Sequence, residues 1–393
     1  MTKKNLLPEE IFNKFSKDIF HCSSCNYCVD AVWSERNINH VCTTMEHFSA
    51  NPSYSGKGFL AAARALVDGV ELDLEGLAAR VSTCTDCGNC EALCPTGLKP
   101  AALGKGLRDW LATEGYSPPR AIAARASIIQ SGRNYPGNTA ELVQSFETEI
   151  FEKPDVSFFI GCASSAGDSK ELQSIRNIVR SMGLRANWIN SDDSCCGAGL
   201  AELGSVAEGD AWRKKVARNV SAEIVVSGYE CFWHLKNGTN LNLIAFPNWF
   251  FEKIKQKSID LKLRTTERIL DQVFLVETCQ LKDRKSRNRT ALTAELLFVE
   301  FLDAMSVGIR NNSYPSPYAI CCSAGGGMPS LQVDASQRAA RERYLLGDPE
   351  AVAVTLDPRC AYHFDKSLSQ DFPVLGFAHF IDEYFEFKVK EEG

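Results

Sequence analysis

The chain has 393 residues, of which 45% are hydrophobic and 23% charged, a composition typical of globular proteins. This length is too great for one hydrophobic core, so we expect two or three domains. The net charge of −6 gives no reason to expect nucleic-acid binding, and no apolar stretch approaches the roughly 18 residues that a membrane-spanning helix needs. The first residues also lack the apolar run of a secretory signal, so we expect a cytoplasmic protein, or one held peripherally at a membrane by a partner.

The first region, residues 1–151, has a helical pattern. Residues 58–69 contain good helix formers with apolar side chains on one face, and residues 74–81 continue this pattern. A break at residues 96–100 is followed by renewed helical spacing over residues 101–114. β-Branched alternation is scarce here, so we predict a helical N-terminal domain.

All sixteen cysteines of the chain fall into four sets of four, and none is left over. In a reducing cytoplasm so many thiols are not expected to form disulfides, whereas thiolates in groups of four are typical ligands of iron–sulfur clusters and of zinc. The first set is Cys22, Cys25, Cys28 and Cys42; the second is Cys84, Cys87, Cys90 and Cys94; the third is Cys162, Cys195, Cys196 and Cys231; the fourth is Cys279, Cys321, Cys322 and Cys360.

The second set has the most specific motif. Residues 84–95 follow C-x-x-C-x-x-C-x-x-x-C-P, the run found in bacterial ferredoxins. Its tight turns bring three thiolates to one face of a four-iron cluster, Gly88 lets the backbone fold around the cluster, and the fourth cysteine of such a run normally reaches a neighbouring cluster. A zinc site is the alternative, but the final Cys94-Pro95 has no reason to appear in a zinc ribbon.

The first set begins the same run, but Val32 stands where the fourth cysteine would be, and Cys42 is the only candidate left. In a two-cluster arrangement the fourth cysteines are exchanged between the clusters. We therefore predict two [4Fe–4S] clusters, one bound by Cys22, Cys25, Cys28 and Cys94, and one bound by Cys84, Cys87, Cys90 and Cys42. A three-iron cluster, or a structural role for Cys42, is the alternative.

Residues 152–265 and 266–393 look like two copies of one unit. In each copy an apolar strand runs into a cysteine, a cysteine pair is followed by small residues, a charged helical stretch comes next, and a second strand precedes the last cysteine. A histidine follows that cysteine three residues later, as His234 and His363. Strand–helix alternation predicts small parallel sheets, with ligands at the carboxyl ends of the strands. We expect a linker of mixed charge, residues 253–268, between the copies.

The paired-cysteine pattern C-x(n)-C-C-G-x(n)-C-x-x-C resembles the cysteine-rich domain, also called the CCG domain, that occurs twice in the disulfide-reducing subunit of heterodisulfide reductase. It also occurs in the iron–sulfur subunits of anaerobic glycerol-3-phosphate dehydrogenase, glycolate oxidase and lactate-utilisation systems. Several of these chains carry two ferredoxin-type clusters followed by two such domains, and the resemblance covers Cys22 to nearly the C-terminus. It implies a helical ferredoxin-like domain (1–151) and two repeated α/β CCG domains (152–265 and 266–393), whose third and fourth cysteine sets each hold a cluster.

Two departures from the family pattern bear on the chemistry. The last position of C-x-x-C is His234 or His363, and the glycine after the second cysteine pair is replaced by Ser323. In heterodisulfide reductase five cysteines per domain hold a noncubane cluster that splits a disulfide, whereas four thiolates suit an ordinary [4Fe–4S] cube. Two alternatives stay open: the histidine is a fifth ligand of a noncubane cluster, or it is hydrogen-bonded beside the cluster.

We therefore predict an iron–sulfur electron-transfer subunit with four clusters, within a hetero-oligomeric oxidoreductase complex. It would relay electrons between a flavoprotein (an FAD-linked dehydrogenase or an electron-transferring flavoprotein) and a second redox partner, for which a membrane- or quinone-linked subunit is one option. The chain has no dinucleotide fingerprint and no P-loop, so flavin chemistry must come from another subunit. The alternatives are a heterodisulfide-type reductase with catalysis at Cys195/Cys196 or Cys321/Cys322, and a structural protein in which one repeat holds zinc.

Overall fold

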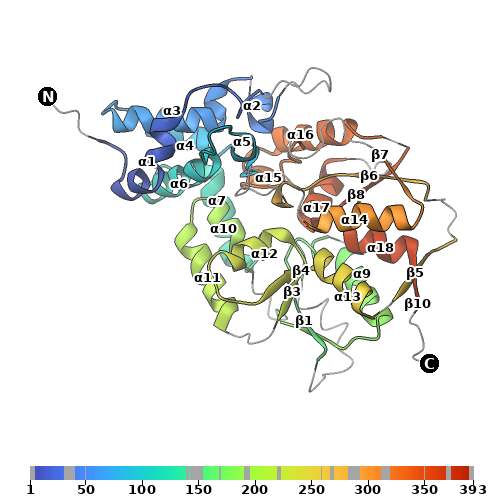
Figure 1. Cartoon of the computed structure of the whole chain (residues 1–393). Helices are drawn as coiled ribbons and strands as arrows, with labels where there is room; N and C mark the ends of the chain where they lie inside the picture. The colour runs from blue at the N-terminus through green and yellow to red at the C-terminus, as the bar shows by residue number, and fades with distance from the viewer. Residues whose placement is uncertain are drawn as a thin grey trace.

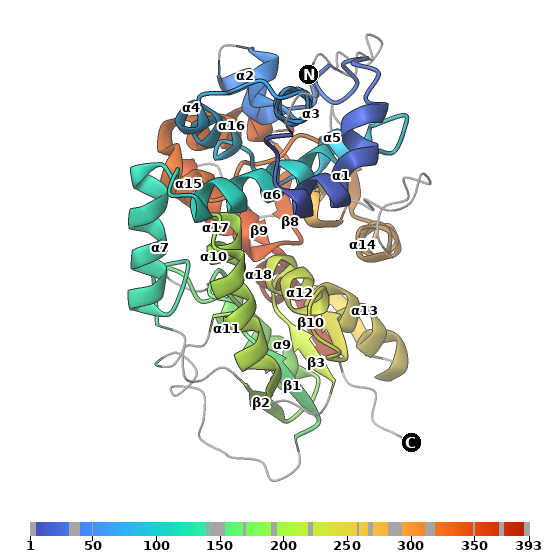
Figure 2. The same cartoon turned by 90° about the vertical axis from the view of Figure 1, so that its left-hand side faces the viewer.

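The computed structural model describes residues 5–30, 40–48, 50–138, 141, 154–167, 170–189, 195–218, 223–257, 259–265, 270–281, 293–310, 319–348, 350–368 and 373–388. All sixteen cysteines lie in these ranges. The N-terminal helices pack together at one end of the molecule, and two small sheets with their helices form the rest (Figures 1 and 2). No helix in the described ranges is long and apolar enough to cross a membrane.

The described residues up to 138 form helices and no strand. Apolar faces of four helices meet in one core around Phe15, Phe59, Leu77 and Leu107, all buried. The predicted helices at residues 58–69, 74–81 and 101–114 are α3, α4 and α6. The helices are α1 (Glu9–His21), α2 (Thr43–His47), η2 (Pro52–Tyr54), α3 (Gly56–Val67), α4 (Leu74–Val81), α5 (Asn89–Ala92), α6 (Pro100–Thr113) and α7 (Pro119–Ser131).

The remainder contains two four-stranded parallel sheets with equivalent strand orders, β2-β1-β3-β4 and β7-β6-β8-β9. The central strands are continuous apolar runs because helices cover both faces of such sheets. The small parallel sheets predicted from the sequence are therefore confirmed. The strands are β1 (Val156–Phe159), β2 (Ala186–Trp188), β3 (Ile224–Val226) and β4 (Leu243–Ala245) in the first sheet, and β6 (Gln272–Leu275), β7 (Gly308–Arg310), β8 (Val352–Thr355) and β9 (Val374–Gly376) in the second.

Helices alternate with these strands in both units. The first unit contains α9 (Lys170–Ser181), α10 (Ala198–Glu202), α11 (Val206–Arg218), α12 (Tyr229–Lys236) and α13 (Phe246–Lys257). The second contains η3 (Cys279–Leu281), α14 (Thr293–Ala304), α15 (Met328–Leu331), α16 (Val333–Leu345), α17 (Pro358–Ser367) and α18 (Phe377–Tyr384). The edge strands β2 and β7 and the helices α9 and α14 carry no motif, and the sequence analysis did not identify them.

The two sheet units interlock. Helix α9 of the first unit packs against α18 of the second, and α13 of the first packs against α14 of the second. Buried aromatic rings from both units, including Phe250, Phe298 and Phe377, contact one another in a shared core. Figure 1 shows α13, α14, α9 and α18 gathered between the two sheets. Each unit therefore completes the other's core.

The expected linker at residues 253–268 is wrong over most of its described length. Residues 253–257 complete α13, and Asp260–Leu263 form strand β5, which pairs antiparallel with β10 (Phe385–Lys388). Leu261 is buried in the shared core, so the short polar–apolar alternation is a strand face. The partner strand lies more than 120 residues away in the chain, so local sequence did not reveal the pairing.

Candidate iron–sulfur sites

The two C-x-x-C-x-x-C runs fold into the same backbone turns. Ser24 and Asn26 have φ values of 56° and 68°, and the residues at the equivalent positions of the second run, Asp86 and Gly88, have φ values of 56° and 72°. A positive φ is uncommon in residues other than glycine, so its recurrence at both positions marks a shared conformation. Turns with left-handed residues orient backbone amides into concave surfaces that bind anions, among them iron–sulfur clusters.

Four cysteines line one pocket next to the first run: Cys22, Cys25, Cys28 and Cys94. Burial raises the pKa of the Cys28 thiol to about 11, and the neighbouring thiols of Cys22 and Cys94 add to this shift. The backbone N–H of Leu98 donates a hydrogen bond to Cys94 Sγ at 3.3 Å. Cys94, the last cysteine of the second run, thus lies with the first three cysteines of the chain.

Cys42 is held beside the second run by two hydrogen bonds of its neighbours. The carbonyl of Val41 accepts a hydrogen bond from Nδ2 of Asn89 at 3.1 Å, and Thr44 Oγ1 donates to the carbonyl of Thr83 at 3.0 Å. Thr83 and Asn89 flank the segment from Cys84 to Cys90, so helix α2 is fixed against both ends of the run.

The thiols around Cys42 interact electrostatically. Burial raises the pKa of Cys42 to about 12, and the nearby thiols of Cys87 and Cys28 contribute to the shift. Burial likewise raises the pKa of Cys90, which also interacts with Glu91, Cys84, Cys87 and Cys42. The structure therefore brings Cys42 to the second run, and its interaction with Cys28 shows that the first two sites adjoin.

The third set forms a chain of thiol contacts at the carboxyl end of the first sheet. Cys162 bonds to Cys195, and Cys195 bonds to Cys196. Cys196 Sγ lies 3.2 Å from Sγ of Cys231. All four side chains are buried, although they come from loops and helix starts that are far apart in the chain.

The fourth set repeats this arrangement in the second sheet unit. Cys321 bonds to Cys279 and Cys322, and Cys322 Sγ lies 3.3 Å from Sγ of Cys360. These four cysteines are also buried. The equivalent order of contacts in the two units follows from their equivalent strand order, which places corresponding loops at corresponding corners of each sheet.

The loops after the cysteine pairs also match. Gly197 has a φ of 91° and Ser323 has a φ of 70°. The N–H of Gly197 donates to Cys195 Sγ at 3.4 Å, and the N–H of Ser323 donates to Cys321 Sγ at 3.3 Å. A Cβ on Gly197 would collide with the backbone of α11, whereas the second unit accommodates the serine. The substitution in the family pattern therefore leaves the loop conformation unchanged.

Both candidate histidines are bonded to a helix backbone. His234 Nε2 lies 3.3 Å from the carbonyl of Gly209 in α11, and His363 Nε2 lies 3.3 Å from the carbonyl of Ser336 in α16. Burial lowers the pKa of His234 to about 4 and also lowers the pKa of His363. Each imidazole is therefore neutral near pH 7, and the contacts support a hydrogen-bonded role beside a cluster.

The second and fourth cysteine sets meet at the boundary between the helical part and the second sheet unit. The thiols of Cys87 and Cys321 are hydrogen-bonded to each other. Asn89 Nδ2 donates to the carbonyl of Ala319 at 3.1 Å. Gly326, with a φ of 64°, lies so close to the second run that a Cβ would collide with the Cys84 carbonyl. The backbones are in direct contact on both sides of the two thiols.

Arg108 of α6 organises the same boundary. Its buried guanidinium donates to the carbonyls of Val81 and Cys84, each at 2.8 Å, and to Asp86 Oδ2 at 3.2 Å. It also donates to the carbonyl of Glu202 at the end of α10. One side chain therefore ties the second run to the first sheet unit.

A buried ion pair joins the two sheet units. Arg359 Nη1 lies 2.7 Å from Glu202 Oε1 and 3.2 Å from Glu230 Oε1. Glu202 Oε2 also accepts a hydrogen bond from the N–H of Gly326 at 3.0 Å. Burial raises the pKa of Glu230 to about 8, although Arg359 opposes this shift.

The sequence analysis missed these charged residues, although a signal was present. Glu230 precedes Cys231, and Arg359 precedes Cys360 at the equivalent position of the second repeat. Aligning the repeats places opposite charges at one position. Such a pair is complementary only if the two units face each other, which the interlocked fold provides.

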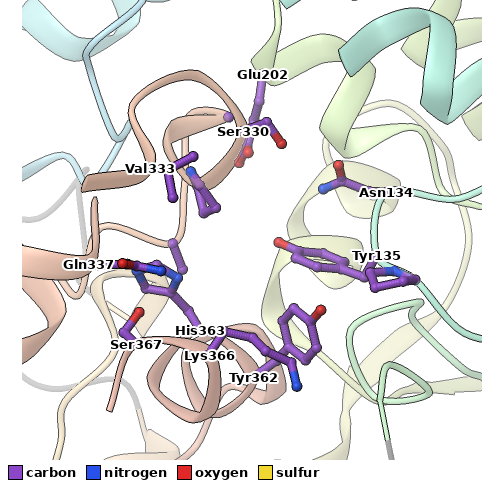
Figure 3. Close-up of a pocket in the computed structure, with 14 residues that line it drawn as sticks. Asn134, Tyr135, Glu202, Ser330, Val333, Gln337, Tyr362, His363, Lys366 and Ser367 are labelled. Atoms are coloured by element: carbon purple, nitrogen blue, oxygen red, sulfur yellow. The ribbon is translucent and has the colours of Figure 1, made fainter. Parts of the chain in front are cut away.

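A cavity of about 240 Å³ lies between the two sheet units (Figure 3). The rings of Tyr135 and Tyr362 meet edge to face on one side, with centroids 5.4 Å apart. Figure 3 shows Gln337 and His363 on the side opposite Tyr135. Among the described residues that line this cavity there is no cysteine.

The cavity nevertheless lies between the third and fourth cysteine sets. The backbone of Asn134, which lines it, bonds to Cys162 of the third set. His363, on the opposite wall, bonds to the backbone of Cys322 of the fourth set. A molecule in the cavity would therefore be separated from either set of thiols by one wall residue.

Comparisons with known proteins agree with this description. Residues 18–98 match the family model of the 4Fe-4S dicluster domain, and residues 156–236 match that of the cysteine-rich domain. The chain is 21% identical over 308 residues to a subunit of dihydromethanophenazine:CoB–CoM heterodisulfide reductase from Methanosarcina mazei, covering 72% of this chain and 71% of that protein. It is also 21% identical over 401 residues to an uncharacterized iron–sulfur protein of Methanococcus maripaludis, covering 96% of this chain and 75% of the relative.

The first family match spans the first two cysteine sets, and the second match spans the third set. The matches confirm both predicted kinds of domain, in the predicted order, and support [4Fe–4S] clusters as cofactors. The chain is therefore an iron–sulfur protein that joins a 4Fe-4S dicluster domain to a cysteine-rich domain, and it is related to an iron–sulfur subunit of heterodisulfide reductase.

Proposed function

We propose that this chain is an electron-transfer subunit of an oxidoreductase complex and that it holds four [4Fe–4S] clusters, which accept and release single electrons. The proposal keeps the three domains 1–151, 152–265 and 266–393. The ligands at the first and second sites are Cys22, Cys25, Cys28 and Cys94, and Cys84, Cys87, Cys90 and Cys42. The ligands at the third and fourth sites are Cys162, Cys195, Cys196 and Cys231, and Cys279, Cys321, Cys322 and Cys360.

The donor set fits such clusters. Each site offers four thiols, and sulfur is the ligand that iron–sulfur clusters require. In the described part of the chain no three His, Cys, Asp or Glu side chains sit as close together as the ligands of one metal ion. A cluster of four irons holds its ligand sulfurs further apart than one ion does, so thiols around a shared pocket, as at the first site, suit it.

The contact between Cys87 and Cys321 carries the proposal of a relay. It makes the second and fourth sites adjacent, and the interaction of Cys28 with Cys42 makes the first and second sites adjacent. The third site follows across the ion pair of Arg359 with Glu230. The sites therefore form a continuous series in the order first, second, fourth, third.

The first site is the proposed place of contact with the electron donor. Of the sixteen cysteines, all of which lie in the described ranges, Cys25 alone is exposed. Tyr27 beside it is 54% exposed, and a flat aromatic side chain is typical of protein interfaces. Flavins convert electron pairs to single electrons, so we propose a flavoprotein as this partner and a second redox partner elsewhere, in a cytoplasmic complex.

The cavity between the sheet units favours a second candidate, a thiol–disulfide reductase of the heterodisulfide type. In that case a substrate would occupy the space beside His363, between the third and fourth sites. The cavity wall separates it from Cys195/Cys196 and Cys321/Cys322, since no described lining residue is a cysteine. This separation is the reason for preferring the relay.

Gentle anaerobic purification from the native cell, followed by mass spectrometry, tests the proposal. We expect a stoichiometric flavoprotein in the purified complex, and we expect its reduced flavin to reduce the clusters. A chain that runs as a monomer and reduces a disulfide rapidly, with only a ferredoxin as donor, would replace the relay with the reductase.

A further inference from the structure

The two sheet units can be aligned residue by residue along α11 and α16. Gly209 and Ser336 occupy equivalent places, because each accepts the hydrogen bond of its unit's histidine and each is the fourth residue of its helix. Seven residues further on, the first unit has Val216 and the second has Arg343. Both side chains are buried, and Arg343 is 0% exposed.

Arg343 lies against the fourth cysteine set. Its guanidinium carbon is 5.7 Å from the centre of the Phe274 ring. It interacts electrostatically with Glu277 and with the thiols of Cys322, Cys360 and Cys321. A buried cation is costly unless negative groups compensate it. Three thiols that become thiolates on binding a cluster are such groups.

Glu277 is the second charge that distinguishes this site. Four residues separate Leu275 from Cys279 in numbering, whereas three separate Phe159 from Cys162. The second unit therefore has one additional residue in this loop, and Glu277 lies within it. The fourth site thus has both a cation and an anion that the third site lacks at these positions.

We propose that Arg343 is a positioning residue that raises the reduction potential of the fourth site above that of the third. This inference rests on the proposed relay, since it requires a cluster at each of these sites. Reduction adds one negative charge to a cluster, and a fixed positive charge nearby favours the reduced form. Glu277 acts in the opposite direction and limits the effect. An electron that arrives from the second site would therefore reside on the fourth.

EPR-monitored redox titration of three variants tests this inference. The variants are Arg343→Met, which removes the charge at similar volume, Arg343→Lys, which retains it, and Glu277→Gln, which removes the anion. Arg338→Gln, on the exposed face of the same helix, is the matched control. Iron is measured in each protein first, so that a lost cluster is not mistaken for a shifted one.

With iron content unchanged, we expect Arg343→Met to lower the potential of one cluster by on the order of tenfold in its one-electron equilibrium, or about 59 mV. Arg343→Lys should stay close to the wild type, and Glu277→Gln should raise the potential of the same cluster. Arg343→Met or Glu277→Gln protein with full iron and unmoved potentials would overturn the inference, as would an equal shift in Arg338→Gln. If Arg343→Met loses its cluster, Glu277→Gln decides alone. Fewer than four clusters in the wild-type protein would instead count against the relay.

Discussion

Left-handed backbone next to cysteines recurs at four residues that are not glycine: Ser24, Asn26, Asp86 and Ser323. Such a conformation costs about 1 kcal/mol or more at each residue, and it persists only where surrounding structure enforces it. The N–H groups of Asp86 and Ser323 both donate to a cysteine Sγ, at 3.4 Å and 3.3 Å. We interpret the strain as the cost of directing backbone amides at sulfur.

Replacing Cys42 tests the exchange of ligands between the first two sites. If Cys42 completes the second site, Cys42→Ser should lower the iron content from about 16 to about 12 per chain. Cys87→Ser is the matched control, because it removes a ligand from the same site. Unchanged iron and EPR spectra in Cys42→Ser would show that another group completes the site.

Replacing His363 tests whether the imidazole is a ligand. Its Nε2 is 3.1 Å from Ser336 Oγ, and a glutamine side chain can still hydrogen-bond there. We therefore expect His363→Gln to retain all iron and to shift one reduction potential, since hydrogen bonds near a cluster tune it. Loss of about four irons would make the histidine a ligand and restore the noncubane alternative; His379→Gln, on α18, serves as the control.

Contacts between elements from different units hold the sites in place. Gly326 allows the loop before α15 to touch the second ferredoxin-type run, because neither a Cβ nor a right-handed backbone fits there. We expect Gly326→Ala to destabilise the iron-loaded protein by more than about 1 kcal/mol, seen as a lower thermal midpoint.

Gly183→Ala separates collision from backbone strain. Gly183 has a φ of 65°, nearly that of Gly326, but no atom lies within 4 Å of a Cβ built there. It therefore reports the cost of backbone strain alone. Equal midpoints for the two variants would mean that the close approach of the loop contributes nothing to stability.

The packing of α9 against α18 predicts a pH dependence. Glu171 in α9 accepts hydrogen bonds from the N–H groups of Ala378 and His379, and burial raises its pKa from 4.5 to about 7. The folded state therefore binds a proton more tightly than the unfolded state does. Glu171 contributes this stability fully below pH 4.5, and the contribution is lost as the pH rises through about 7.

Glu171→Gln removes this titration, so its thermal midpoint relative to the wild type should rise between pH 5 and pH 8. The underlying free energy is at most about 3 kcal/mol, from the size of the pKa shift. Glu114→Gln, at an exposed carboxylate, should show no such trend. Parallel midpoint curves for wild type and Glu171→Gln would contradict the prediction.

Across the whole molecule, the four cysteine sets lie along one series that begins at the exposed Cys25 and continues into the buried sets of the sheet units. Burial of the third and fourth sets lowers their access to water, and the interlocked units prevent either from folding apart from the other's helices.

The iron content of the anaerobically purified protein tests this arrangement as a whole. Four sites of four irons predict about 16 irons per chain and a brown protein. The expected zinc content is negligible. About 8 irons with stoichiometric zinc would instead support a structural role for the sheet units.

The sequence by itself determined the local features. The spacing of Cys84 to Cys94 defines a ferredoxin-type run because cluster binding there depends on tight turns between neighbours. Apolar runs that end at Cys162 and Cys279 predicted the central strands, and the strong helix formers of residues 58–69 predicted a helix. Each of these signals lies within one segment of chain, where local backbone preferences decide the outcome.

Only the tertiary structure decided how those segments meet. The contact of Cys87 with Cys321, the pairing of β5 with β10 and the ion pair of Arg359 with Glu202 each join residues more than 120 positions apart. Arg343 and Val216 look unremarkable in the sequence and differ in meaning only because both are buried at equivalent places in the two units. Long-range contacts depend on how two completed units fit together, and local sequence does not encode this fit.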